Sequence, residues 1–314
     1  MIPFAMNPMG RSRNGGSGGV VPLTLTAVTA GATVRLDAIG SPTVSGLQYR
    51  TGAGEWSSYT PGTTITLANV GDYVQFQNTE NTLSTGTSNY VRFVMAGTVA
   101  GSGNIQSMLN YSDACQEYCY YYMFQGRTGL TTAPDLPATT LATGCYRYMF
   151  NGCTGLTTAP ELPATTLAAS CYYYMFYGCT GLTTAPDLPA TTLADSCYYS
   201  MFRGCIGLTT APDLPATTLA TSCYRYMFYN CTGLTTAPDL PATTLAASCY
   251  YGMFYGCTNL NSVTVRLTSW TDTSYTNNWL YGVSASGTFT CPAGLTVPER
   301  SASGVPAGWT IVRV

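Results

Sequence analysis

The sequence predicts a multidomain protein in which a small all-β sandwich is followed by an α/β solenoid and a β-rich C-terminal cap. First, a segment that starts at Cys119 recurs with a period of 26 residues, and a fixed period of this length is typical of stacked repeats. Second, short β-branched runs separated by Gly, Asn, Pro and Ser clusters precede the repeats. Third, Gly, Thr, Ser and Tyr are abundant, which favours turn-rich β structure facing water.

The charge content limits the classes of function. The net charge is −2 and only 8% of residues are charged, so no long-range field would steer a polyanion to the protein, and we expect no nucleic-acid binding. The chain has no histidine, which removes the commonest general base and the commonest metal ligand. We therefore expect no enzymatic activity, no catalytic residue, no cofactor and no metal site.

Residues 1–19 are expected to form an N-terminal anchoring arm. They lack the basic start and the uninterrupted apolar run of a secretory signal. Nowhere does the chain contain 18 consecutive apolar residues, so we expect no membrane span. Without export, the cysteines should stay reduced during synthesis. We expect the arm to dock on a partner protein, its two arginines facing an acidic groove, through Ile2, Phe4, Met6, Arg11 and Arg13.

Residues 20–97 predict a β-sandwich domain, because short alternating runs are separated by turn residues. The expected strands are Val21–Thr26, Ala32–Leu36, Leu47–Arg50, Thr63–Leu67, Tyr73–Phe76 and Tyr90–Val94. Residues 98–118 follow as a connector and as the N-terminal cap of the solenoid. This connector has helical potential at Ile105–Leu109.

The first half of each repeat within residues 119–260 predicts a short helix. The repeat reads C-Y-x-Y-M-F-x-G-C-T-G-L-T-T-A-P-D-L-P-A-T-T-L-A, and its Met–Phe pair occurs in all six copies. On an ideal helix, five residues of the first copy share an arc of about 140°; they are Cys119, Tyr120, Met123, Phe124 and Arg127. Constant residues on this inner arc and variable residues opposite indicate a helix. Its expected N-caps are Ser170, Ser196, Ser222 and Ser248.

The second half of each repeat predicts a short strand. Paired prolines, Pro134 and Pro137 in the first copy, remove two ladder donors, so the strand must end near them. One short strand, one turn and one short helix in 26 residues correspond to a leucine-rich-repeat-like unit. Such a unit buries too few apolar side chains to offset its own ordering entropy. Stability must therefore come from stacking, and both ends need caps.

Residues 261–314 are expected to form the C-terminal cap. Strands are expected at Ser262–Leu267, Gly287–Cys291 and Trp309–Val314, with a last degenerate helix at Tyr275–Tyr281. Aromatic side chains should cover the exposed end of the core, and the candidates are Trp270, Trp279 and Trp309.

Two further columns of residues have a structural and a chemical interpretation. The cysteines follow a C-x7-C spacing, which favours reduced thiols packed in the core over disulfides between coils or tetrahedral metal sites.

An acidic residue stands between the prolines of each complete copy, and five equivalent carboxylates favour a role in the turn. A Ca²⁺ site and a catalytic pair are the alternatives for this column. Its members are Asp135, Glu161, Asp187, Asp213 and Asp239.

The outward tyrosines and arginines of the repeats are the candidates for binding a ligand or a partner, because such side chains suit sugar stacking and protein interfaces. The alternative is that they pack on one another and merely cover the helices. The candidate surface comprises Tyr121, Arg147, Tyr173, Tyr177, Tyr199, Arg203, Arg225, Tyr229, Tyr251 and Tyr255.

The repeat unit resembles the BspA-type leucine-rich repeat of surface proteins of gut Bacteroidales and of their phages. The segments Gly46–Arg50, Gly71–Phe76, Gly103–Leu109 and Asn278–Val283 resemble the regions that flank such repeats, so the resemblance covers about residues 20–314. It implies adhesion and display rather than a reaction.

Secreted members of that family carry an export or anchor signal, from which this sequence departs. We therefore expect a phage virion structural protein, a head fibre or capsid decoration at the virion surface. Its arm would dock on a capsid protein, and its repeats would face glycans or a cell-surface receptor. By analogy with such fibres, a homotrimer is expected. The alternative is a BspA-like adhesin on the bacterial cell surface.

Overall fold

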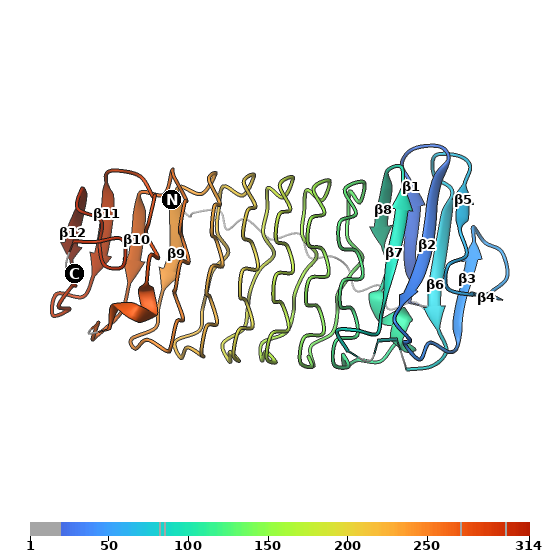
Figure 1. Ribbon diagram of the computed structural model, residues 1–314, viewed down its shortest axis with the longest axis horizontal. Helices are drawn as coiled ribbons and strands as arrows, with labels where there is room; N and C mark the ends of the chain where they lie inside the picture. Colours follow the sequence, from blue (N-terminus) through green and yellow to red (C-terminus); the bar gives the residue numbers. More distant parts are fainter. Residues whose placement is uncertain (1–19, 82, 85, 271, 299) are drawn as a thin grey trace, which may run out of the picture.

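A computed structural model describes residues 20–314 except 82, 85, 271 and 299. The chain forms an elongated body with a two-sheet β domain at one end, a row of stacked coils in the middle and a small parallel sheet at the other end (Figure 1). In this described part of the chain, no helix is long and apolar enough to cross a membrane.

The N-terminal β domain consists of two antiparallel sheets. One sheet has the strand order β4-β3-β6-β1-β8 and the other β5-β2-β7. Buried and partly exposed residues alternate along most of β2, so one face of the strand packs in the core and the other faces solvent. The strands are β1 (Leu23–Ala27), β2 (Ala32–Ile39), β3 (Leu47–Thr51), β4 (Ser57–Ser58), β5 (Ile65–Leu67), β6 (Tyr73–Asn78), β7 (Tyr90–Ala96) and β8 (Val99–Ser102). All six strands expected in this region are present.

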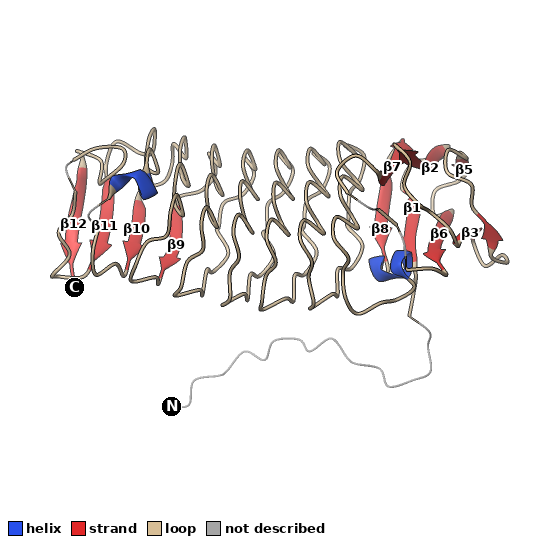
Figure 2. Ribbon diagram, turned by 60° about the horizontal axis from the view of Figure 1, so that its bottom comes forward, coloured by secondary structure: helices blue, strands red, loops and turns tan. Residues whose placement is uncertain are grey.

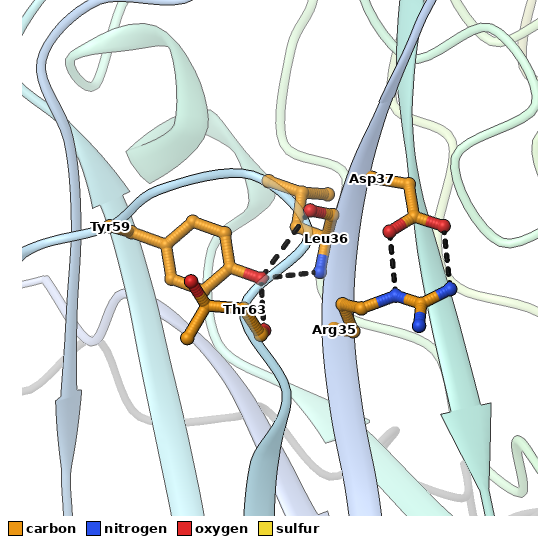
Figure 3. A network of polar contacts seen from close by, with 5 residues as sticks. All are labelled: Arg35, Leu36, Asp37, Tyr59 and Thr63. Atoms are coloured by element: carbon orange, nitrogen blue, oxygen red, sulfur yellow. Dashed lines mark hydrogen bonds and ion pairs between the residues drawn. The ribbon is translucent and has the colours of Figure 1, made fainter.

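A polar network ties the loop before β5 to β2 (Figure 3). The Tyr59 hydroxyl accepts a hydrogen bond from the Leu36 amide (2.8 Å) and donates one to the Thr63 carbonyl (2.6 Å). Next to it, Arg35 and Asp37 form a two-pronged ion pair with N–O distances of 2.6 and 3.0 Å. The network gives the buried Tyr59 hydroxyl its hydrogen-bond partners and holds the loop on β2.

The expectation of an α/β solenoid is wrong, because the described residues contain no α-helix. The only helical elements among them are two short 3₁₀ helices, η1 (Ile105–Leu109) and η2 (Thr273–Thr276), neither in the repeats. The predicted helical potential at 105–109 is thus realised as a 3₁₀ turn. The ten residues that begin one position before the first cysteine of each copy, which we call the turn half, are a series of turns. The turn halves are residues 118–127, 144–153, 170–179, 196–205, 222–231 and 248–257.

Backbone hydrogen bonds in a turn half alternate between two directions. In the third copy, the Tyr173 amide donates to the Ser170 carbonyl three residues back (3.2 Å), whereas the next amide, of Tyr174, donates to Tyr199 of the following coil (2.9 Å). This alternation continues through Gly178, whose amide donates to Arg203 of the following coil (2.8 Å). An α-helix would direct every amide to its own segment. Here half of them join neighbouring coils.

A left-handed backbone conformation at every fourth residue produces this pattern. In the third copy Ser170, Tyr174 and Gly178 have φ values of 53°, 55° and 69°. The serines predicted as N-caps occupy the first of these places, with φ between 53° and 56°, and cap no helix; they are Ser170, Ser196, Ser222 and Ser248. A turn series that repeats every four residues and an α-helix that repeats every 3.6 residues bury nearly the same positions of a short segment. The pattern of inward residues alone therefore cannot distinguish them.

The burial that the periodicity predicted is present despite the different backbone. The Met and Phe of every copy are completely buried; they are Met123, Met149, Met175, Met201, Met227 and Met253 with Phe124, Phe150, Phe176, Phe202, Phe228 and Phe254. The phenylalanine rings form one stack with centroids 5.5–5.7 Å apart. The tyrosines at the second place form a parallel stack at 5.4–6.1 Å.

The extended half of each copy, which follows the turn half, is less regular than predicted. Among the described residues of the repeats, only the fifth copy forms a strand, β9 (Thr236–Leu240). This strand pairs in parallel with β10 (Ser262–Val265). Earlier copies make isolated bridges instead, such as Thr158 with Thr184. The paired prolines limit strand pairing in every copy, because each removes a ladder donor, but they do not explain the difference, since β9 contains Pro238 of the same pair.

Both ends of the stacked coils are covered (Figure 2). At the N-terminal end the Val99 amide of β8 donates to Gly129 (2.9 Å), and Phe93 of β7 stacks on Phe124 at 5.1 Å. At the other end a parallel sheet continues from β10 through β11 (Gly287–Cys291) to β12 (Trp309–Arg313). The three tryptophans expected to close the core are at most 4% exposed. They are Trp270, Trp279 and Trp309.

A glycine substitution distinguishes this turn geometry from a helix. Gly152 has φ of 72°, and a Cβ added there meets no atom closer than 3.6 Å, so only backbone strain opposes Gly152→Ala. We expect Gly152→Ala to lower the free energy of unfolding by about 1–2 kcal/mol in a urea titration. The matched control is Gly294→Ala, at a site with open space and no positive φ, where we expect no loss. Equal stability of the two variants would contradict the left-handed assignment.

Candidate functional site

The predicted surface residues gather along one edge of the stacked coils, which we call the tyrosine–arginine rim. Counting from the first cysteine of each copy, they occupy the third and seventh places, and tyrosines at the fourth place lie between them. Nine of the ten are partly exposed; they are Arg147, Tyr173, Tyr177, Tyr199, Arg203, Arg225, Tyr229, Tyr251 and Tyr255. Tyr121 is the exception at 6% exposure.

The rings of the rim stack on one another. Tyr173 and Tyr199 lie 4.6 Å apart with 15° between their planes, and Tyr229 and Tyr255 lie 4.5 Å apart with 3° between theirs. The coil spacing imposes this arrangement, because equivalent side chains of adjacent coils lie about 5 Å apart. Since neighbouring rings cover each other's faces, the rim presents ring edges and hydroxyl groups to solvent.

Each arginine of the predicted set lies over the ring at the same place in the following copy. The guanidinium carbons of Arg147, Arg203 and Arg225 lie 4.2–4.3 Å from the centroids of Tyr173, Tyr229 and Tyr251 respectively. Such cation–π contacts are worth about 0.5–1 kcal/mol each at exposed sites. The rim therefore consists of rings and guanidinium groups that contact one another, some face to face and some edge-on, with hydrogen-bond donors among them.

The environment of the tyrosines keeps their hydroxyl groups protonated. Burial, and then neighbouring tyrosines, raise the pKa of Tyr173 to about 12. The pKa of Tyr199 is raised by burial, although Arg225 and Arg203 act in the opposite direction. At neutral pH these hydroxyls are donors as well as acceptors.

Two tyrosines that sequence reasoning missed extend the rim at its ends. Tyr281, 51% exposed, stacks on Tyr255 at 4.7 Å; it lies one period after Tyr255, so the 26-residue spacing could have identified it. Tyr90 of β7 contacts Tyr121 edge-on at 5.3 Å and helps to bury it. No periodicity points to Tyr90, because it belongs to the β domain.

The cysteines are free thiols in the core, as the core-packing interpretation predicted. All thirteen are buried and unpaired. In the second column each thiol donates to a phenylalanine carbonyl of the preceding coil at 3.0–3.1 Å, as Cys153 does to Phe124 and Cys205 to Phe176. These bonds add a contact between coils at each step. Within the described residues, no group of three or more Cys, Asp or Glu side chains could hold a metal ion.

The acidic column lies in the extended halves, and its five members are exposed: Asp135, Glu161, Asp187, Asp213 and Asp239. Asp239 pairs with Arg266 of the next coil at 3.1 Å. The turn halves contain no Asp or Glu at all. The acidic column and the arginines of the turn halves are therefore separated around each coil.

The predicted anchoring residues Ile2, Phe4, Met6, Arg11 and Arg13 lie outside the described residues, so their role stays a prediction. In comparisons with known proteins, no family model, curated protein or solved structure matches the chain. The resemblance to BspA-type repeats therefore also stays an expectation.

The buried thiols predict a loss of stability at alkaline pH. Burial raises the pKa of Cys205 to about 12 in the folded chain, whereas an exposed thiol ionises near pH 8.5, roughly. The unfolded chain therefore releases this proton first, and the stabilisation, complete below the unfolded pKa, is lost as pH rises toward the folded pKa. We expect the urea midpoint to be lower at pH 10 than at pH 7, with a smaller difference in Cys205→Ala. Identical midpoints at both pH values would contradict burial of the thiols.

Proposed function

We propose that this chain is a non-enzymatic adhesion and display protein whose tyrosine–arginine rim binds carbohydrate on a cell surface. The observation that carries the proposal is the continuous row of partly exposed hydroxyl and guanidinium groups along the stacked coils. Sugars offer rows of hydroxyl groups and ring oxygens, which a row of donors at coil spacing can engage repeatedly. Many weak contacts then add up along a polymer.

The backbone geometry supports such a role. A surface that binds a polymer must hold its groups in a fixed register, and preorganisation reduces the entropy lost on binding. Hydrogen bonds between coils, such as Phe176 to Met201 at 2.9 Å, recur along the turn halves. The rim residues project from this bonded backbone and are further fixed by stacking. The side chains therefore lose little freedom when a ligand arrives.

We further propose that the protein is a virion structural component, a head fibre or capsid decoration whose residues 1–19 dock on a capsid protein. Two observations support this: the resemblance of the repeats to BspA-type proteins of Bacteroidales and their phages, and the composition of the arm. The alternative is a bacterial surface adhesin of the same repeat type. Purifying phage particles and probing them for this chain distinguishes the two, since an adhesin would fractionate with bacterial envelopes.

Removing the rim's rings tests the adhesion proposal. The triple variant Tyr173→Ala, Tyr199→Ala, Tyr229→Ala deletes three stacked rings with their hydroxyls. We expect attachment of the labelled protein to Bacteroidales cells to fall at least about tenfold, the factor for the loss of one or two hydrogen bonds. Because the rings are half-buried, the melting temperature should fall by a few degrees while the chain stays folded.

Two control variants separate binding from packing. Replacing the same tyrosines by Phe keeps the stack and removes the hydroxyls, and should also weaken attachment. Replacing the exposed Thr158, Thr184 and Thr210 of the extended halves by Ala should leave attachment unchanged. Full attachment by the folded triple Ala variant would refute the role of the rim.

A further inference from the structure

The rim has one place where two guanidinium groups gather around a single ring. The guanidinium carbon of Arg203 lies 5.7 Å from the ring centroid of Tyr226, and that of Arg225 lies 5.2 Å from the same centroid. Most other copies carry a tyrosine at the fourth place, but the fourth copy carries Ser200 there. The absent ring leaves this part of the rim to the two arginines and to Tyr199.

Neither of these two arginines forms an ion pair within the described residues. The charged residues of the turn halves are all arginines; they are Arg127, Arg147, Arg203 and Arg225. The ion pairs found among the described residues, Arg35 with Asp37 and Arg266 with Asp239, involve none of them. Two neighbouring like charges repel each other, and a bound anion removes that repulsion while accepting charge-assisted hydrogen bonds.

Polar atoms without partners lie at the same point. In the described structure, the Ser200 hydroxyl and the Arg225 Nε are buried and form no hydrogen bond. The Ser200 side chain is completely inaccessible, and its amide donates to the Arg225 carbonyl at 2.9 Å, so the two residues are adjacent. Buried polar groups are almost always hydrogen-bonded, because an unpaired one costs free energy. A guanidinium that lacks an acceptor for its Nε, with the second guanidinium of Arg203 near the same ring, is typical of a site that lacks its anion.

We infer that Arg203 and Arg225, with Tyr199 and Tyr226, form a binding site for the anionic group of an acidic polysaccharide. This inference deepens the proposed carbohydrate binding and rests on it. A planar guanidinium fork matches carboxylate and sulfate oxygens, and the surrounding hydroxyls match the sugar. A single-stranded nucleic acid fits less well, because its bases stack on free aromatic faces, whereas the Tyr226 ring is already contacted by two guanidinium groups and by the edges of neighbouring rings.

The test measures binding of the full chain to immobilised polymers at low salt. Polygalacturonate supplies carboxylates, its fully methyl-esterified form supplies the same backbone without charge, dextran sulfate supplies sulfates, and poly(dT) supplies phosphates on a nucleic acid. We expect wild type to bind at least one acidic polysaccharide, with a preference for carboxylate or sulfate identifying the anion. It should bind the methyl ester and poly(dT) at least about tenfold more weakly, and salt should weaken the acidic interaction.

Arginine variants locate the site. Arg225→Gln should reduce affinity for the preferred acidic polymer about tenfold, as expected for one charge-assisted hydrogen bond. Arg147→Gln is its closest match, because Arg147 also lies 4.3 Å from the ring of the following copy and also has an unpartnered Nε, but has no second arginine over its ring; its loss should be smaller. Arg266→Gln, exposed in the extended region, should change nothing. Circular dichroism and melting curves confirm that each variant is folded.

The outcomes separate this inference from the proposed function. Equal binding of polygalacturonate and its methyl ester, with no effect of Arg225→Gln, would leave carbohydrate binding intact and overturn the anion site. Equal losses of affinity in Arg225→Gln and Arg147→Gln would also overturn it, because any arginine of the rim would then attract the polymer equally well. Preferential binding of poly(dT) would overturn both proposals, as would binding of no polymer by a chain that also fails to attach to cells.

Discussion

The hydrogen bonds that join one turn half to the next are the interaction on which the rest of the molecule depends. Because every second amide, such as that of Tyr174, donates to the following coil, the coils are tied together by backbone rather than by side chains alone. This requires a left-handed residue at every fourth position, which costs about 1–2 kcal/mol for residues other than glycine. The cost falls on tyrosine and serine in several copies. It is offset because the amides would otherwise be buried without partners.

The fixed stacking has consequences inside the molecule. Identical side chains lie above one another, so the core consists of separate columns of methionine, phenylalanine, tyrosine and cysteine instead of an irregular mixture. A column of identical rings packs well only if its ends are covered. Phe93 of the β domain and Trp279 of the cap fulfil that requirement. The β domain, the coils and the cap consequently share one continuous hydrophobic core.

The same stacking shapes the exterior. Tyrosines that could have offered their faces to a sugar offer them to each other, so recognition must use edges and hydroxyls. Arginines enter the stack as flat cations, and because the acidic residues lie in the extended halves, their charges face solvent unpaired. Variation among the copies then matters at single positions. Where Ser200 replaces a tyrosine, two guanidiniums come near one ring, and the otherwise uniform rim acquires a distinct centre.

The sequence by itself determined which residues are inside. The period of 26, the constant Met–Phe pair, the strands of the β domain and the tryptophans of the cap all follow from hydrophobic patterning, which reports burial directly. It also identified the rim, because variable polar positions alternate with constant apolar ones.

Only the tertiary structure decided the backbone of the repeats and the orientation of the rim. A helix of period 3.6 and a turn series of period four bury the same residues over ten positions, so the α/β prediction failed at Ser170 and Tyr174, where φ is positive. The two backbones differ in the carbonyl to which each amide donates. For every second amide of the turn half, that carbonyl lies about one repeat further along the chain. The contacts of the rim also join residues that are far apart in the chain. Tyr121 is buried by Tyr90, and Arg203 and Arg225 lie near the same ring, only because coils from different parts of the sequence stack in register.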